Sequence, residues 1–280
     1  MTAAVHRFPA PAKLNLMLRV VGRRADGYHL LQTVFRFIDY GDVLSFRVRD
    51  DGIIARSSPV AGVAAEDDLS VRAARLLKRA AGTAFGADLT LDTRLPMGGG
   101  LGGGSSDAAT TLLALNRLWR LDLPRAQLLE LALQLGADVP VFVAGDNAFA
   151  EGIGERLTPI VLPPAWYLVL TPPVAVSTAR VFSHPELKRD SKLITIQSFS
   201  VEPARNDLEP LVCREYPEVA RHLEWLRQYA PALMTGSGAG VFAGFAAESA
   251  AREVLARLPA TMKGFVAQGL ARHPLRDLAR

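Results

Sequence analysis

The sequence has few of the features that mark secreted, metal-cluster or membrane proteins. It contains one cysteine, Cys213, which can form neither an internal disulfide nor a thiolate metal cluster. No window reaches the roughly 18 apolar residues of a membrane span, because polar residues interrupt even the apolar stretch Leu112–Leu123. Met1–Ala12 lacks the apolar core of a secretory signal. We therefore expect a soluble, cytoplasmic protein with no membrane partner.

The chain also carries little excess charge of either sign. Thirty-two Lys and Arg against 28 Asp and Glu give a net charge of +4, spread along the whole chain. Nucleic-acid binding needs basic residues gathered on one face, so we expect no nucleic-acid partner. The hydrophobic share of 49% and the charged share of 21% are those of ordinary globular proteins, and they exclude disorder and fibres. A chain of 280 residues has room for one large or two modest domains.

Hydrophobic patterning predicts a mixture of strands and helices in the first half. From Lys13 the chain alternates with period two, which indicates a half-buried strand with Lys13, Asn15, Met17 and Arg19 on its polar face. Two shorter strands are expected on either side of Gly41. Asp67 or Asp68 can cap the next helix, and Gly82 suits its end. The elements expected here are strands at 31–38, 43–48 and 88–95, and helices at 69–81 and 108–119, with a further helix from Pro124 to Gly136.

The second half reads as a smaller sandwich of strands and helices. Strands are expected at 166–170, 232–235, 241–245 and 262–268, and helices at 217–229 and 248–258, while residues 184–210 are irregular. Paired prolines at 163–164 support a junction nearby. We predict an α/β (α+β) protein with domains at residues 1–160 and 161–280.

The densest chemical signal is a run of six glycines in seven positions: Gly98, Gly99, Gly100, Gly102, Gly103 and Gly104, interrupted by Leu101. Glycine is entropically costly, so this run indicates that a ligand approaches the backbone closely. Ser105, Ser106 and Asp107 lead directly into a helix, whose free amides and positive dipole end favour a phosphate. The alternative is a flexible hinge with Ser106 as an ordinary helix cap.

Two common phosphate motifs fit poorly. A Walker A loop requires a lysine where Ser105 stands. A dinucleotide fingerprint is matched formally, but any glycine run this dense satisfies its spacing, and the preceding strand is too polar for a sheet buried on both faces.

The loop instead resembles that of the GHMP kinases, the family of galactose, homoserine, mevalonate and phosphomevalonate kinases. The resemblance begins with Pro96-Met-Gly-Gly-Gly-Leu-Gly-Gly-Gly-Ser-Ser-Asp-Ala-Ala. It extends in order through Pro11-Ala-Lys-Leu-Asn-Leu, Arg24-Ala-Asp-Gly-Tyr-His, Leu135-Gly-Ala-Asp-Val-Pro-Val-Phe, Phe149-Ala-Glu-Gly-Ile-Gly-Glu and Met234-Thr-Gly-Ser-Gly-Ala-Gly-Val-Phe. It implies a ribosomal-protein-S5-like ATP-binding domain followed by a ferredoxin-like domain, in a monomer or homodimer.

The resemblance also implies a reaction. A kinase of this subgroup moves the γ-phosphate of ATP, with Mg²⁺, to the 2-hydroxyl of a cytidine-diphosphate-linked methylerythritol (CDP-methylerythritol) in the non-mevalonate isoprenoid route. Phosphoryl transfer needs a positioning group or base, a cation and cradled phosphates. The implied catalytic residues are Lys13 and Asp138. The implied ATP site comprises Pro96, Met97, Gly98 to Gly104, Ser105, Ser106 and Asp68, and the implied substrate site comprises Asn15, Tyr28, His29, Thr178 and Phe182. Ser106 is also a candidate Mg²⁺ ligand.

The residues alone leave structural alternatives open. Asp138 could cap a helix that begins at Val139-Pro140, and Lys13 could be a solvated edge charge. Tyr28 and Phe182 could pack in a core. The second glycine turn, Gly236–Gly240, could either close on the active site or form an ordinary hairpin.

Three departures from the family pattern bear on the site. Asp68 stands where the subgroup commonly has an amide near the adenine, Gly240 replaces a frequent cysteine, and residues 184–206 match nothing. Two rival functions remain: a kinase for another small alcohol such as mevalonate or homoserine, and a nucleotide-binding regulator without catalysis.

Overall fold

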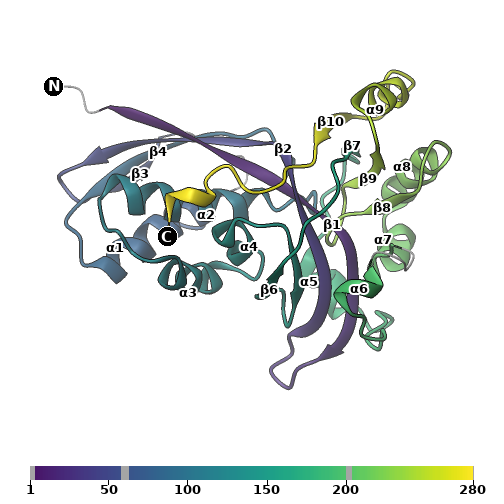
Figure 1. The fold of residues 1–280 in the computed structure, drawn as a ribbon, viewed down its shortest axis with the longest axis horizontal. Helices are drawn as coiled ribbons and strands as arrows, with labels where there is room; N and C mark the ends of the chain where they lie inside the picture. Colours follow the sequence, from purple (N-terminus) through teal and green to yellow (C-terminus); the bar gives the residue numbers. More distant parts are fainter. Residues whose placement is uncertain (1–3, 58–62, 200–203, 280) are drawn as a thin grey trace.

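The computed structural model describes residues 4–57, 63–199 and 204–279, which form two β-sheets with helices packed against each. The first sheet has the order β3-β4-β2-β5-β6, with β1 paired to β2, and the second has the order β10-β7-β9-β8. The expected mixed α/β architecture is confirmed. Figure 1 shows the two long strands β1 and β2 running from the helical part of the molecule to the second sheet.

A long antiparallel hairpin, β1 (Val5–Arg23) and β2 (His29–Arg49), connects the two halves of the molecule. The prediction of two strands separated at Gly41 was wrong, because β2 passes through Gly41 without a break. Gly41 pairs with Pro11, and a Cβ at position 41 would lie 2.1 Å from the carbonyl oxygen of Ala10. Glycine here allows two backbones to approach closely rather than ending a strand.

The expected half-buried character of β1 was also wrong. Lys13, Asn15 and Arg19 on its polar face are buried, as are Leu14 and Leu18 on the other face. The reason is that both faces are covered. The second sheet packs on one face, where Ala12, Leu14 and Ile38 form one hydrophobic cluster with residues of β7, β9 and β10, and the two glycine turns contact Lys13 and Asn15 on the other. Polar side chains are costly in a strand that is covered on both faces. Those of Lys13 and Asn15 line a cavity.

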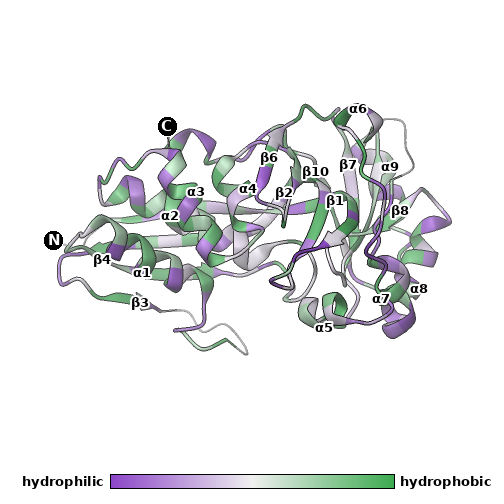
Figure 2. Ribbon diagram, turned by 90° about the horizontal axis from the view of Figure 1, so that it is seen from below, coloured by the Kyte–Doolittle hydropathy of each residue, from purple (hydrophilic) through white to green (hydrophobic). Residues whose placement is uncertain are grey.

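Four helices lie on one side of the first sheet, two of them directly against its strands and two packed on those helices (Figure 1). They are α1 (Leu69–Ala81), α2 (Gly103–Leu118), α3 (Arg125–Leu135) and α4 (Val139–Ala144). Helix α1 has the predicted bounds, with Asp68 as its N-cap and Gly82 in the left-handed conformation at its end. Helix α2 begins at Gly103 rather than at Ala108, so part of the glycine run is helical. Figure 2 shows hydrophobic and hydrophilic residues alternating along α1 and α3, as expected of helices with one buried face.

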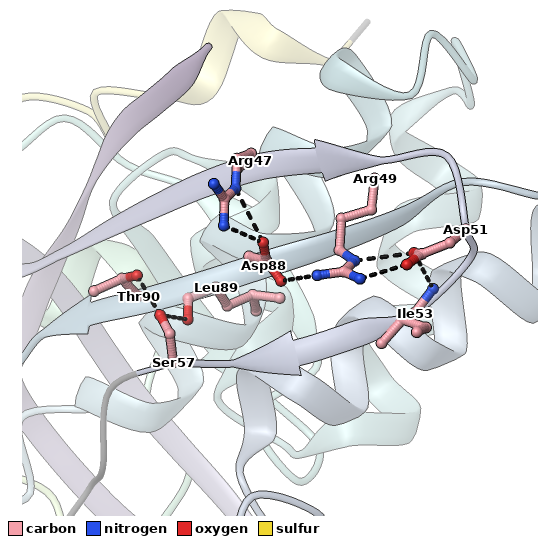
Figure 3. A network of polar contacts seen from close by, with 8 residues as sticks. All are labelled: Arg47, Arg49, Asp51, Ile53, Ser57, Asp88, Leu89 and Thr90. Carbon is pink, nitrogen blue, oxygen red and sulfur yellow. Dashed lines mark hydrogen bonds and ion pairs between the residues drawn. The ribbon is translucent and has the colours of Figure 1, made fainter. Parts of the chain in front are cut away.

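Around β3 and β4 the opposite face of the first sheet is polar. Asp88 of β4 (Gly86–Asp92) binds Arg47 at 2.7 Å and Arg49 at 2.9 Å, both from β2 (Figure 3). Ser57, which follows β3 (Ile54–Arg56), binds Thr90 on the same face. The polar alternation of β4 in the sequence therefore reflects a sheet with one solvated face. Strands β5 (Ala148–Glu151) and β6 (Arg156–Pro159) complete this sheet.

The second sheet comprises β7 (Trp166–Leu170), β8 (Ala232–Met234), β9 (Val241–Phe245) and β10 (Gly264–Gln268). Helices α8 (Pro217–Arg227) and α9 (Glu248–Leu255) pack against it. The short helices α5 (Thr178–Ser183), α6 (Ile196–Phe199) and α7 (Glu209–Glu215) lie in and beside the segment expected to be irregular. None of the described helices is both long and apolar enough to cross a bilayer.

The C-terminal segment returns from β10 to the first part of the molecule. Leu270 N–H donates to the carbonyl of Phe37, and His273 N–H donates to that of Gly145. The 3₁₀ turn η1 (Arg276–Leu278) follows, and Arg125 of α3 donates to the carbonyl of Ala279 at 2.6 Å. The division proposed at residue 160 thus separates the two sheets but leaves the chain end packed on the first.

Candidate active site

A cavity of about 960 Å³ opens between the two parts of the molecule. Its walls come from β1, the turn after β1, the start of α1, the glycine run, the start of α4, helix α5 and the second glycine turn. The predicted site residues that line it are Lys13, Asn15, Tyr28, His29, Asp68, Pro96, Met97, Gly98, Gly99, Gly100, Leu101, Gly102, Gly103, Gly104, Ser105, Asp138, Thr178 and Phe182. Segments far apart in the sequence therefore meet at one place.

The glycine run forms a tight loop that leads into α2. Gly98, Gly100 and Gly102 have φ values of 68°, 69° and 75°, in the left-handed region that favours glycine. Ser106 N–H donates to the carbonyl of Gly102, which is the first hydrogen bond of the helix. The N–H groups of Gly103, Gly104 and Ser105 therefore have no partner within the helix, and a helix start of this kind binds anions.

The second glycine turn packs directly on this loop. Ala239 N–H donates to the carbonyl of Gly98 at 2.8 Å, and Gly240 N–H donates to that of Gly99 at 3.0 Å. The turn also connects β8 to β9 as a hairpin. A Cβ at Gly240 would lie 2.6 Å from the Gly99 carbonyl oxygen, so glycine at this position permits the contact.

Lys13 and Asp138 form an ion pair beside the loop. Lys13 Nζ lies 3.1 Å from Asp138 Oδ2, 3.1 Å from the Gly100 carbonyl oxygen and 2.6 Å from Asn15 Oδ1. Lys13 is 3% exposed, which excludes a solvated edge charge, whereas the Asp138 side chain is 38% exposed at the cavity. Asp138 occupies the N-cap position of α4, but its side chain makes no capping hydrogen bond. The carboxylate therefore remains available to a ligand.

Aromatic residues lie at another part of the cavity wall. The rings of His29 and Phe182 are 5.0 Å apart and tilted by 36°, and Tyr28 is exposed. Arg189 Nε donates to His29 Nε2 at 2.9 Å. Burial and then the charges of Arg189 and Arg23 lower the pKa of His29 below its usual 6.5. The Thr178 hydroxyl, at the start of α5, lies 2.7 Å from that of Ser237 in the second glycine turn.

Two residues predicted to contact the nucleotide, Ser106 and Asp68, make other contacts in the structure. Ser106 is fully buried, and its hydroxyl donates to the carbonyl of Pro11 at 2.7 Å rather than facing the cavity. Because the helix starts at Gly103, Ser106 turns inward and Ser105 takes the cavity side, so Ser106 does not fit the expected role of Mg²⁺ ligand. Asp68 lines the cavity but caps α1 and pairs with Arg56 at 2.6 Å. Its carboxylate offers no donor in place of the expected amide.

Several residues of this site were missed by sequence reasoning. Arg189 lies in the segment that matched nothing, and no local pattern reports its contact with His29. Ser237 could have been found, since it lies within the second glycine turn. Asp42 and Asp107 line the cavity as buried carboxylates. Asp107 could have been included in the predicted site, because it directly follows the two serines of the glycine loop.

Comparison with known families decides the classification. A family model for the GHMP kinases N terminal domain matches residues 68–146, and one for the GHMP kinases C terminal matches residues 190–264. The chain belongs to the GHMP kinase family. It is therefore a small-molecule kinase, and kinases of this family use ATP as co-substrate.

Several known proteins match this GHMP kinase over nearly its full length. A 4-diphosphocytidyl-2-C-methyl-D-erythritol kinase of Nitrosospira multiformis is 67% identical, with 97% of this chain and 93% of that protein covered. One of Thiobacillus denitrificans is 63% identical, over 96% and 97% of the two chains. A crystal structure of a 4-(cytidine 5'-diphospho)-2C-methyl-D-erythritol kinase superposes with a TM-score of 0.82 at 35% identity, covering 94% and 99%.

We predict that His29 of this GHMP kinase is neutral at pH 7 and titrates below 6.5, because burial and Arg189 disfavour its charged form. Imidazole NMR signals followed through a pH titration measure this. Arg189→Met should raise the pKa of His29, since it removes the nearest positive charge, whereas Arg252→Met on the remote helix α9 should not. A His29 signal that titrates above 6.5, or that ignores the Arg189 substitution, would contradict the electrostatic account.

Proposed function

We propose that this kinase transfers the γ-phosphate of ATP to the 2-hydroxyl of 4-diphosphocytidyl-2-C-methyl-D-erythritol, giving the 2-phosphate and ADP, in the non-mevalonate isoprenoid route. The observation that carries the proposal is the Lys13–Asp138 ion pair at 3.1 Å, which lies beside a phosphate-binding type of loop in the same cavity as a wall of aromatic residues. The names of the relatives, at 63% and 67% identity over almost the whole chain, support the choice of substrate.

The triphosphate binds across the start of α2 in this proposal. The free N–H groups of Gly103, Gly104 and Ser105 donate to phosphate oxygens, and the helix dipole adds favourable charge. The adenine lies against the part of the wall formed by Leu69, Leu91, Leu95, Pro96 and Met97, close to Asp68.

Lys13 and Asp138 act on the reacting groups. The substrate hydroxyl donates to Asp138, which receives its proton as the oxygen–phosphorus bond forms and the bond to the β-phosphate oxygen breaks. Lys13 is held by Asn15 and Gly100, so its ammonium is already oriented to stabilise the negative charge of the transferring phosphoryl group. The same lysine holds the Asp138 carboxylate beside the reacting groups through the 3.1 Å ion pair.

The aromatic wall binds the cytidine. Tyr28 and Phe182 offer ring faces to the base, and such stacking contributes about 1–3 kcal/mol per base. Because His29 Nε2 accepts a hydrogen bond from Arg189, the ring proton of neutral His29 belongs on Nδ1. Nδ1–H can then donate to an acceptor on the edge of cytosine, while Thr178 lies at the same wall.

Magnesium fits this site mainly as a partner of ATP. No group of three or more His, Cys, Asp or Glu in the described ranges could hold a metal ion. Mg²⁺ characteristically keeps several waters and binds through substrate phosphates with one or two protein ligands. In the proposal, phosphate oxygens and water would supply most ligands of the ion. Ser105, which lines the cavity, is the hydroxyl that the chain could add. The ion would neutralise phosphate charge during transfer.

The substrate assignment is tested by comparing alcohols at a fixed ATP concentration. The purified kinase should turn over 4-diphosphocytidyl-2-C-methyl-D-erythritol, because the aromatic wall contributes binding that mevalonate and homoserine cannot use. Coupled measurement of ADP release gives kcat/KM for all three. Faster turnover of mevalonate or homoserine would refute the assignment, and no turnover of any alcohol would favour a regulator.

Asp138→Asn should lower kcat by about tenfold to about a thousandfold, because the amide cannot accept the hydroxyl proton. The dissociation constant for ATP should stay close to that of the wild type, since the phosphates contact the glycine loop. Asp146→Asn, past the other end of α4 and paired with Arg276, is the matched control and should retain wild-type kcat. Wild-type turnover of Asp138→Asn would remove Asp138 from the mechanism.

A further inference from the structure

Arg189 lies behind the aromatic wall and has no assigned part in the reaction proposed above. It belongs to the irregular segment between α5 and α6, is partly buried and does not itself line the cavity. Its side chain nevertheless reaches a residue proposed to bind the base, because Nε donates to His29 Nε2 at 2.9 Å. A residue that acts on a base-binding group from behind can determine which base that group accepts.

All five N–H groups of the Arg189 guanidinium make hydrogen bonds to neutral acceptors. One acceptor is His29, and the other four are backbone carbonyls within residues 182–187, at 2.7 to 3.5 Å. The carbonyl of Phe182 is among them, at 3.1 Å. Arg189 therefore fixes both members of the His29–Phe182 pair, whose rings lie 5.0 Å apart at the cavity.

The contact between Arg189 and His29 also fixes the position of the imidazole proton. A guanidinium has donors only and keeps its charge, so His29 Nε2 must be the acceptor. A protonated ring would turn a second N–H toward the Nε–H of Arg189, and burial and the charges of Arg189 and Arg23 accordingly lower the pKa of His29. The ring is neutral, with its proton on Nδ1, the nitrogen left for a ligand.

A fixed donor distinguishes cytosine from uracil. On the edge that pairs in nucleic acids, cytosine has an unprotonated nitrogen, N3, whereas uracil has an N–H at that position. His29 Nδ1–H can donate to N3 of cytosine, but it would meet the N3–H of uracil, and two donors that face each other leave both without a partner. If the proton could move to Nε2, Nδ1 could accept from uracil and the distinction would be lost.

We propose that Arg189 is a positioning residue that makes the base site selective for cytosine over uracil, by holding the proton of His29 on Nδ1 so that the base meets a donor. This rests on the proposed binding of cytidine at the aromatic wall. The competing interpretation is that Arg189 only holds the backbone of residues 182–187. Its loss would then weaken the binding of both bases alike.

The first measurement is ¹⁵N NMR of the imidazole at pH 8, well above the usual histidine pKa of about 6.5. The two neutral tautomers differ in the chemical shifts of Nδ1 and Nε2. Arg189→Lys should keep the proton on Nδ1 as in the wild type, because an ammonium can also only donate. Arg189→Met should give a mixture of tautomers. Lys188→Met removes the neighbouring exposed charge and, as the matched control, should resemble the wild type.

The second measurement is calorimetry with CDP and UDP, which differ only in the base, with saturating ADP to occupy the glycine loop. The wild type, Lys188→Met and Arg189→Lys should prefer CDP. Arg189→Met should lose about tenfold of that preference, which is the size of one hydrogen bond. Both Arg189 variants lose contacts with the carbonyls of residues 182–187, so a merely structural role would leave them with the same ratio of affinities.

Arg189→Met with the wild-type ratio of CDP to UDP affinity, or with the His29 proton still on Nδ1, would overturn the proposal and leave the proposed reaction untouched. Equal affinity of the wild type for CDP and UDP would also overturn it. If Arg189→Met does not fold, Arg189→Gln takes its place, because an amide can either donate or accept and should lose the same preference. A kinase with the expected tautomer and CDP preference that phosphorylates no CDP-linked alcohol would support this proposal and refute only the proposed reaction.

Discussion

Main-chain hydrogen bonds from the second glycine turn, Gly236–Gly240, hold the glycine loop in place. Six glycines in seven positions are costly to order, and a loop of that composition needs external contacts to keep one conformation. Gly98 and Gly99 receive these contacts from Ala239 and Gly240 of the other part of the molecule, and Gly100 accepts from Lys13. The loop, the catalytic candidates and the second sheet therefore form one unit, and the cavity exists only where both parts meet.

The burial of the β1–β2 hairpin fixes the position of the Lys13 ammonium group. Contacts with the glycine loop and with Thr235 cover the polar face of β1, where Lys13, Asn15 and Thr33 are buried. The hydrogen bonds of Asn15 to Lys13 and Thr33 and the ion pair with Asp138 compensate for this burial. A charged group fixed in this way needs little reorganisation when charge develops on a substrate.

Capping residues and hydrophobic patterns in the sequence correctly predicted the ends of several helices and strands. Helix α1 has its predicted ends because Asp68 and Gly82 provide the cap and the left-handed turn, and β9 has its predicted bounds. Contacts distant in sequence were not predictable in the same way. Gly41 was misread as a break because its close neighbour is Ala10 on another strand, and the contact of His29 with Arg189 joins segments without a shared pattern. The inward position of Ser106 was not predicted, because the helix starts within the glycine run, which turns its hydroxyl toward Pro11.

The central claim is that the glycine loop holds a triphosphate with its terminal group pointing at Lys13 and Asp138. A crystal structure with a non-hydrolysable ATP analogue and the cytidine substrate together tests this most directly. The account predicts β- and γ-phosphate oxygens within hydrogen-bond distance of the Gly103–Ser105 amides, and the substrate 2-hydroxyl between the γ-phosphate and Asp138. Phosphates bound away from those amides, or an acceptor hydroxyl remote from Asp138, would contradict it.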